Sequence, residues 1–178
     1  MTIHWTSYDT PFGPIVLVEA DEGPLVIEYP ARAALLHWED EVRSRMPRIR
    51  IEPGPCERTA GWLDRYFAGD PEPHPFPYHL GRYFLRSTAH VVIWRTIWEI
   101  PFGETRSYDD VAQTTNLHPR HVGQVVASNQ LAIVIPSHRM VGKRGDLVGY
   151  GGGLGTQRWL LDHELRTAGV VLRPEAAP

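Results

Sequence analysis

Residues 107–129, SYDDVAQTTNLHPRHVGQVVASN, contain two helix starts within a short span. Ser107 suits the N-cap of a first helix, and Asp109 and Asp110 would add favourable negative charge to its first turn. Pro119 suits the first position of a second helix, because the N–H that proline lacks has no partner there. Two short helices joined by a tight polar turn predict a helix-turn-helix, although an ordinary helix pair shows the same pattern.

A proline-rich stretch separates this region from a first half of different composition. Residues 69–77, GDPEPHPFP, carry prolines at alternate positions, which favours an extended connector. Residues 1–80 hold 7 basic against 13 acidic side chains, giving −6, and residues 81–178 hold 11 against 8, giving +3. Any surface for nucleic acid is therefore expected in the second half, and ordinary uneven surface charge is the alternative.

The first half alternates between strand and helix patterns. Apolar runs at residues 15–19 and 25–29 flank the turn residues 21–23 and predict a β-hairpin. Two helices are expected after it, from apolar residues at helical spacing. These residues are Leu35, Trp38, Val42 and Met46, then Trp62, Leu63, Tyr66 and Phe67. We predict an α/β domain over residues 1–80 that includes the connector at 69–80.

The second half, residues 81–178, is predicted to be a mainly α-helical domain. Val91, Trp94 and Trp98 recur at helical spacing before the sequence breaks at residues 100–104. An apolar run that ends at Ile135 is typical of a buried strand. Both halves are large enough to contribute to an apolar core.

Composition excludes several classes of protein. The hydrophobic fraction is 42%, and no apolar run approaches the ~20 residues that span a bilayer. The start lacks the pattern of a secretory signal, and a lone Cys56 forms no internal disulfide. We therefore expect a cytoplasmic protein with no membrane association. His118 and His121 are too few ligands for a metal site, so neither zinc nor any other cofactor is predicted.

Spaced motifs across the chain resemble the O6-alkylguanine-DNA alkyltransferases. The N-terminal DTPFGP at residues 9–14 is similar to the opening strand of that family, and the resemblance extends to about residue 165. It implies a ribonuclease-H-like N-terminal α/β domain and a C-terminal winged helix-turn-helix domain. The remaining matching elements are IPFGET at 100–105, Ser107-Tyr108, Arg120, Asn129, Pro136-Ser137-His138-Arg139, GYGGGL at 149–154, Trp159-Leu160-Leu161 and Glu164.

The resemblance implies a DNA-binding role for the second helix, about Pro119 to Asn129, which in this family lies in the minor groove. Arg120 would enter the base stack in place of the flipped guanine, and Tyr108 would crowd the 3′ phosphate. Asn129 would join this helix to the Pro-Ser-His-Arg segment through side-chain hydrogen bonds. Double-stranded DNA containing O6-alkylguanine is the implied partner.

The resemblance also implies a pocket for the flipped base. Backbone carbonyls around Ser137 and Met140 would accept the guanine amino group. Tyr150 would form one wall, and the Gly151 amide would donate to the alkylated oxygen. Pro136 and Arg139 complete the motif around the reactive position.

Ser137 occupies the position at which this family carries the cysteine that accepts the alkyl group. His138 and Glu164 would form a proton relay, through water and through a hydrogen bond respectively. A serine hydroxyl is far less acidic than a thiol, whose free pKa is about 8.5. We therefore predict that Ser137 accepts no alkyl group at a useful rate.

Two interpretations follow. The first is an alkyltransferase-like protein that binds O6-alkylguanine by base flipping, acts as a monomer and directs the lesion to nucleotide excision repair proteins. The second is an alkyltransferase inactivated by a cysteine-to-serine replacement at residue 137. A general DNA-binding module is a third possibility. A serine hydrolase is disfavoured, because neighbouring residues on an extended segment point to opposite faces and no Gly-X-Ser-X-Gly motif occurs.

Two positions depart from the family pattern. Gln130 follows Asn129 where proline is common, and residues 120–124 lack the usual alanines. Both changes lie at the second helix of the predicted helix-turn-helix, so they bear on the angle at which it meets DNA.

Overall fold

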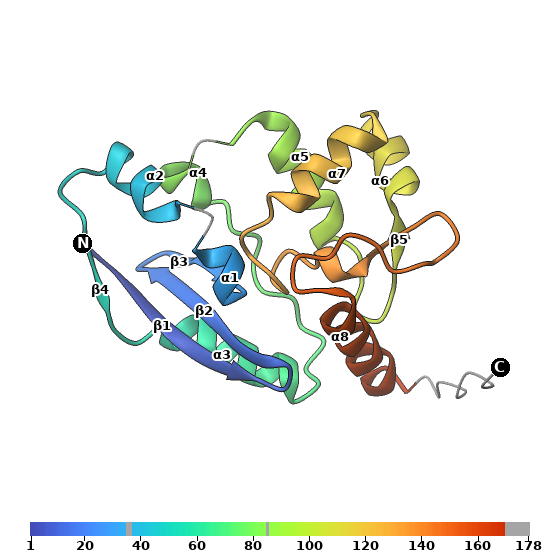
Figure 1. The fold of residues 1–178 in the computed structure, drawn as a ribbon, viewed down its shortest axis with the longest axis horizontal. Coiled ribbons are helices and arrows are strands. Elements are labelled where there is room, and N and C mark those ends of the chain that lie inside the picture. The colour runs from blue at the N-terminus through green and yellow to red at the C-terminus, as the bar shows by residue number, and fades with distance from the viewer. Residues whose placement is uncertain (35–36, 85, 170–178) are drawn as a thin grey trace.

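The computed structural model describes residues 1–34, 37–84 and 86–169, and Figure 1 shows a small sheet from the first half beside a group of helices from the second. The sheet has the strand order β3-β2-β1-β4, in which β1 to β3 form an antiparallel meander and β4 pairs with β1 in parallel. The predicted hairpin is confirmed as β2 and β3. The strands are β1 (Thr2–Thr10), β2 (Gly13–Ala20), β3 (Gly23–Glu28) and β4 (Arg50–Pro53).

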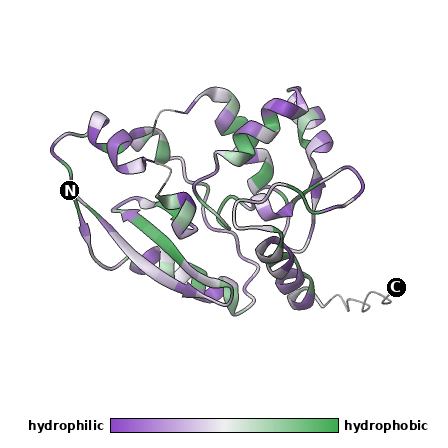
Figure 2. Ribbon diagram, viewed as in Figure 1, coloured by the Kyte–Doolittle hydropathy of each residue, from purple (hydrophilic) through white to green (hydrophobic). Residues whose placement is uncertain are grey.

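The strands of the sheet differ in how deeply their residues are buried. β1 alternates between more and less exposed residues, whereas every residue of β3 is buried. Figure 2 shows the same contrast, with a hydrophobic β2 in green beside a mostly white and purple β1. The helix α3 (Glu57–Phe67) lies across one face of this sheet (Figure 1) and buries Trp62, Leu63 and Tyr66. The second predicted helix of the first half is therefore confirmed.

The other predicted helix of the first half is shorter than expected. α2 (Trp38–Arg45) begins after His37, whose left-handed backbone with φ of 44° interrupts the helical path. Leu35 lies outside the described residues, and Met46 follows the helix as its C-cap residue. Of two four-residue helices, α1 (Pro30–Ala33) lies in this half and α4 (Leu80–Tyr83) lies at the boundary between the halves.

The second half is mainly helical, as predicted. A two-residue strand β5 pairs in parallel with β6, and a 3-10 helix η1 lies just before β6. The elements are α5 (Thr88–Trp98), β5 (Arg106–Ser107), α6 (Tyr108–Thr115), α7 (Pro119–Ala127), η1 (Ser137–Arg139), β6 (Met140–Val141) and α8 (Leu154–Thr167).

Both helices of the helix-turn-helix, α6 and α7, begin where Ser107 and Pro119 predict. Ser107 and Asp110 form a reciprocal capping box at the start of α6, and Asn116 ends that helix in the left-handed conformation. His118 caps α7 by accepting the Arg120 N–H at Nδ1, at 3.1 Å. α7 ends at Ala127, so Asn129 lies just beyond the helix.

The helix predicted from Val91, Trp94 and Trp98 is confirmed as α5. Trp94 is buried, whereas Val91 is 40% exposed. The buried residues of this helix are Ile93, Trp94 and Ile97, which follow the same helical spacing with a different starting point. Several consecutive apolar residues make both starting points equally compatible with the sequence.

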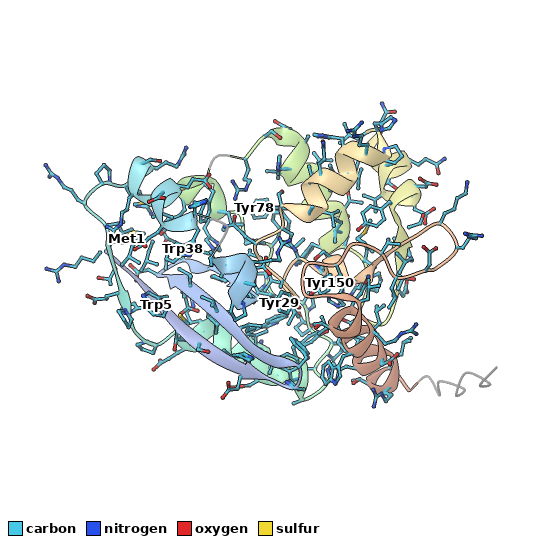
Figure 3. The ribbon with its side chains drawn as sticks, in the orientation of Figure 1. Met1, Trp5, Tyr29, Trp38, Tyr78 and Tyr150 are labelled. Carbon is cyan, nitrogen blue, oxygen red and sulfur yellow. The ribbon has the colours of Figure 1, made fainter. Side chains whose placement is uncertain are left out.

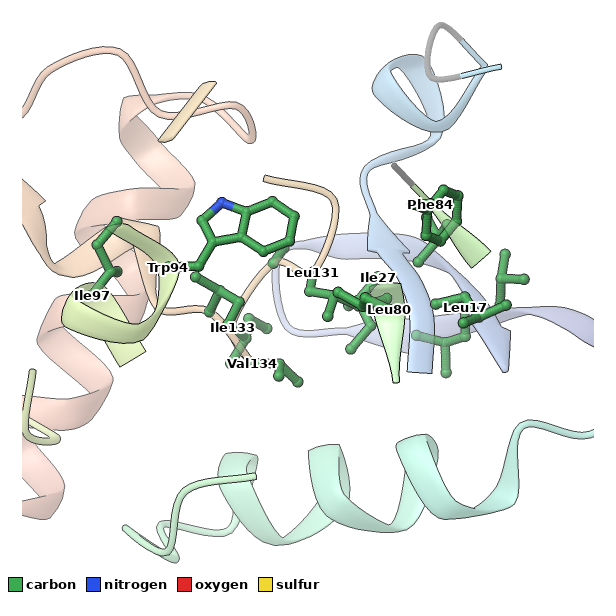
Figure 4. Close-up of a cluster of buried hydrophobic side chains, with 14 of the residues drawn as sticks. Leu17, Ile27, Leu80, Phe84, Trp94, Ile97, Leu131, Ile133 and Val134 are labelled. Carbon is green, nitrogen blue, oxygen red and sulfur yellow. The ribbon is translucent and has the colours of Figure 1, made fainter. Parts of the chain in front are cut away.

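The run before Ile135 is buried but is not the predicted strand. Ile133 has a positive φ of 71°, and the Ile135 N–H donates to the Leu131 carbonyl at 2.9 Å, so the chain turns here. The run meets the sheet at one bridge between Ile27 and Leu131. Its side chains pack between the sheet and α5 (Figure 4), which joins the two halves through one apolar cluster.

The proline-rich connector contains no helix or strand between residues 69 and 79, in agreement with the prediction. Trp62 and Trp98 hold it in place by donating indole N–H groups to the carbonyls of Glu72 and His74, at 3.3 and 2.8 Å. One apolar cluster extends across both halves. The division of the chain into two domains at residue 80 therefore stays a prediction from the sequence.

Candidate functional site

A small pocket lies where the two halves meet. Five of the site residues predicted from sequence line it, although up to 43 positions separate them: Tyr108, Asn129, Ser137, Tyr150 and Gly151. The other lining residues are Val126, Ala127, Ala132 and Gly149 from the second half and Glu28, Tyr29 and Arg32 from the first.

Ser137 begins η1 at the wall of this pocket and is 8% exposed. The hydrogen bonds expected from Asn129 are present: its Nδ2 donates to Ser137 Oγ at 3.1 Å and to the Ile135 carbonyl at 2.9 Å. Asn129 Oδ1 accepts the Leu131 N–H at 3.0 Å. One buried amide therefore fixes the segment after α7 relative to η1.

His138 lies behind Ser137 and is fully buried. Its Nε2 is 2.6 Å from Oε1 of Glu164, which is also fully buried. Burial lowers the pKa of His138, and Glu164 opposes this effect. Among the described residues, His138 Nδ1 has no hydrogen-bond partner although it is buried. This nitrogen is left for a solvent molecule or a reacting group.

Ser137 and His138 do not form a hydrolase-like pair. They lie on a 3-10 helix, so the extended geometry assumed from the sequence is wrong. Within the part of the chain that the structure describes, no hydrogen bond joins Ser137 Oγ to the His138 ring. A serine nucleophile requires such contact with its base, so the arrangement gives no support for a serine hydrolase.

Glu164 is the centre of a buried hydrogen-bond cluster. Arg139 donates from Nε to Oε2 at 2.9 Å and from Nη2 to Oε1 at 3.0 Å. Tyr66 Oη donates to Oε1 at 2.7 Å, and the Gly103 N–H donates to Oε2 at 3.0 Å. Burial raises the pKa of Glu164, but His138 and Arg139 outweigh it and hold that pKa well below its usual range. Glu164 is therefore a carboxylate at neutral pH.

Tyr150 and the glycines after it form the side of the pocket nearest the first half. Figure 3 shows Tyr150 close to Tyr29, and their hydroxyl oxygens are hydrogen-bonded at 2.8 Å. A Cβ at Gly152 would collide with the Tyr29 ring, and one at Gly151 would lie 2.8 Å from Arg32 Nε. These glycines are therefore required for close packing of the first half on the pocket wall.

The remaining predicted residues lie outside the pocket wall. Arg120 is exposed on the first turn of α7. Met140 is fully buried and does not line the pocket, and its carbonyl accepts Gln157 Nε2 at 2.9 Å inside the core. Pro136 is also buried, and Arg139 is directed to Glu164.

Sequence reasoning missed the contribution of Glu28, Tyr29 and Arg32 to the pocket. They follow the predicted hairpin, and nothing in their local pattern indicates a site. It also missed Lys143 and Arg144, which are exposed in the loop after β6. Lys143 Nζ lies 4.0 Å from Asp109 of α6, so this loop adds positive charge beside the helix-turn-helix.

Cys56, the single cysteine in the sequence, lies away from the pocket wall at the start of α3. It is 2% exposed, and its thiol faces the Leu17 carbonyl at 3.7 Å. Burial raises the pKa of this thiol to about 12. A buried, protonated thiol is a poor nucleophile.

No group of three or more His, Cys, Asp and Glu side chains is arranged to hold a metal ion in residues 1–34, 37–84 and 86–169. Over the same ranges, no helix has the length and apolar character needed to cross a membrane.

Comparison with known proteins relates this chain and its fold to DNA alkyltransferases. The profile described as "6-O-methylguanine DNA methyltransferase, DNA binding domain" matches residues 89–166. The solved structure of Mycobacterium tuberculosis OGT in complex with DNA superposes with a TM-score of 0.72 at 26% identity, covering 92% of this chain and 94% of that one. The predicted fold class, an α/β domain followed by a winged helix-turn-helix, is confirmed.

Curated relatives define the family more narrowly. A methylated-DNA–protein-cysteine methyltransferase of Mycobacterium bovis is 33% identical over 170 residues, covering 91% of this chain and 92% of its own length. A protein of the same name from Methanosarcina acetivorans is 31% identical, with 91% and 98% covered. The chain belongs to the methylated-DNA–protein-cysteine methyltransferase family.

Proposed function

We propose that this chain binds O6-alkylguanine in duplex DNA by flipping the base into the pocket, and that it does not transfer the alkyl group. One observation carries the proposal: the pocket contains Ser137, and the single cysteine, Cys56, is buried elsewhere. Transfer to protein requires a nucleophile that ionises readily, and neither residue meets that requirement.

The second half provides a surface suited to DNA. Arg120 is exposed at the start of α7, and Tyr108, the first residue of α6, lines the pocket. We assign Arg120 to the space left by the flipped base and Tyr108 to the adjacent phosphate. Flipping requires a few kcal/mol, and less for a base that pairs badly, which favours damaged sites. Lys143 and Arg144 would contact phosphates nearby.

Within the pocket, the alkylated base would lie between Tyr150 and the Ser137 segment. The Gly151 amide would donate to the alkylated oxygen, and the Ser137 carbonyl would accept the amino group. The Met140 carbonyl already accepts from Gln157, so we assign it a smaller share of base recognition. The carboxylate–imidazole pair of Glu164 and His138 would remain behind the base without a thiol to activate.

We further propose that the bound lesion is passed to nucleotide excision repair proteins and that the chain acts as a monomer. The second interpretation is an alkyltransferase whose acceptor cysteine is replaced by serine at residue 137. Both interpretations give the same chemistry for this chain, namely recognition without transfer. The codon for residue 137 in the genomic gene distinguishes them.

Equilibrium binding to DNA tests the proposed function. A duplex with one O6-methylguanine is expected to bind about tenfold or more tightly than the same unmodified duplex, a difference of about 1.4 kcal/mol. Fluorescence anisotropy at a fixed salt concentration measures both affinities, because phosphate contacts make each of them salt-dependent. Equal affinities would identify a general DNA-binding module instead.

Replacing Arg120 by alanine is expected to reduce the preference for methylated over unmodified duplex, because the extruded base loses the side chain that fills its place. The matched control is Arg144→Ala, since Arg144 is also exposed and basic but lies in the loop after β6. The control should weaken binding to both duplexes by similar factors. An unchanged preference in Arg120→Ala would exclude this residue from base flipping.

A further inference from the structure

An ion pair from the first half, Glu28 and Arg32, forms part of the pocket wall and has no role in the function proposed so far. Arg32 Nε donates to Glu28 Oε2 at 2.9 Å, and the Tyr29 N–H donates to Glu28 Oε1 at 2.9 Å. The Glu28 side chain is 2% exposed and that of Arg32 is 28% exposed. The pocket therefore contains a charged pair in a partly dehydrated place.

Contacts with the second half fix the position of the Arg32 guanidinium. Its Nη2 donates to the carbonyls of Ala127 and Asn129, at 2.9 and 3.4 Å, just after α7. Across residues 1–34, 37–84 and 86–169, no hydrogen bond is made by Nη1. Arg32 is thus a positioned cation with donor capacity that the protein does not use.

The guanidinium lies against the glycine run. A Cβ built on Gly151 would be 2.8 Å from Arg32 Nε and 2.9 Å from Cζ, so a side chain at this position would displace the guanidinium. In the proposed function, on which this step rests, the Gly151 amide donates to the alkylated oxygen of guanine. A group attached to that oxygen would therefore extend along the wall that Arg32 helps to form.

We propose that Arg32 is a specificity-determining residue, which makes the pocket favour O6 adducts that end in a carboxylate over uncharged adducts of the same size. A guanidinium binds a carboxylate through charge-assisted hydrogen bonds, which are about twice as strong as neutral ones. The effect is larger in a pocket than in water, because the local dielectric constant is lower.

Glu28 moderates this preference. Its carboxylate uses the Nε edge of Arg32 and would repel a second carboxylate bound to the same guanidinium. Removing its charge while keeping its shape, in Glu28→Gln, should therefore increase the preference for an anionic adduct. Removing the guanidinium should abolish the preference. The two substitutions act in opposite directions, which general damage to the fold would not produce.

The test compares duplexes with O6-carboxymethylguanine and with O6-carbamoylmethylguanine, which has nearly the same shape and no charge. The wild-type protein should bind the carboxymethyl duplex about tenfold more tightly, as expected for one charge-assisted contact. This ratio should fall to about one in Arg32→Gln. It should also be about one in the double variant Glu28→Gln/Arg32→Gln, which leaves no buried charge unpaired.

A wild-type ratio of about one would overturn the assignment, and so would a tenfold ratio that persists in the folded double variant. An O6-methylguanine duplex and an unmodified duplex are measured in parallel. Preference for methylguanine with no carboxymethyl preference would overturn the role of Arg32 alone. Equal binding of methylated and unmodified duplexes would overturn the proposed function and this inference together.

Discussion

Replacing Ser137 by cysteine is expected to convert the protein from no detectable alkyl transfer to transfer of one methyl group per chain. The new thiol would enter a pocket whose other residues are already in place, next to His138, whose Nδ1 has no hydrogen-bond partner in the described part of the chain. Neighbouring imidazole groups promote thiolate formation, and the thiolate is the nucleophile. Intact-protein mass measurement after incubation with an O6-methylguanine duplex would show the gain.

The native cysteine provides a matched control for that experiment. Cys56→Ser in the Ser137→Cys background should leave the transfer unchanged, because Cys56 is buried and its pKa is raised to about 12. Ser137→Ala should bind the lesion and gain no methyl group. If Ser137→Cys binds the methylated duplex but stays unmodified, the pocket does not present the alkyl carbon to residue 137, and the proposed base position is wrong.

Glu164→Gln is expected to destabilise the fold by roughly 3–5 kcal/mol, the range found when one partner of a buried ion pair is removed. The amide keeps the shape of the side chain but leaves the Arg139 guanidinium, only 9% exposed, without its counter-ion. The free energy of unfolding, measured with denaturant, gives the difference. Glu104→Gln is the control, since the Glu104–Arg106 pair is about half exposed and should change stability by ~1 kcal/mol at most.

The same substitution should change the pH dependence of stability. Because the folded-state pKa of Glu164 is depressed, its ionisation stabilises the fold above the usual carboxyl pKa, and this contribution is lost as the pH falls below that value. The wild-type protein should therefore lose more stability than Glu164→Gln when the pH falls from 6 to 3. Parallel losses would show that the Glu164 cluster contributes little.

This cluster explains why a protein without an acceptor thiol would keep the residues of a proton relay. Glu164 accepts hydrogen bonds from Tyr66 of α3, the Gly103 N–H and both residues of the 138–139 segment. Loss of any charged member would leave a buried charge or donor unpaired. The relay residues are therefore required for the fold, whether or not they serve chemistry.

Local signals in the sequence predicted where the two helices of the helix-turn-helix begin. Ser107 and Pro119 act within the first turn of their own helix, so their effect can be read without knowing the rest of the fold. The buried turn before Ile135 could not be read in this way. Its β-branched residues favour a strand, but the chain pairs with Ile27 only at Leu131 and then turns, with Ile133 at a positive φ.

The residues that line the pocket also include some that the sequence predicted and some that it did not. Family motifs in the second half predicted Tyr108, Asn129, Ser137 and the residues at 150–151. The residues at 28–32 reach the pocket through contacts that span 95 to 121 positions of the chain, and no local pattern records such contacts. Gln130 is a similar case: it replaces a proline common in the family, and its amide donates to the Leu25 carbonyl of β3 at 2.8 Å.

Recovery of both partners after binding tests the central claim most directly. The protein is incubated with an excess of duplex that contains one O6-methylguanine, and the mass of the protein and the methylguanine content of the DNA are then measured. Recognition without transfer predicts a stable complex, an unchanged protein mass and full recovery of the methylated base. A methyl group on the protein, or loss of the methylated base from the DNA, would contradict it.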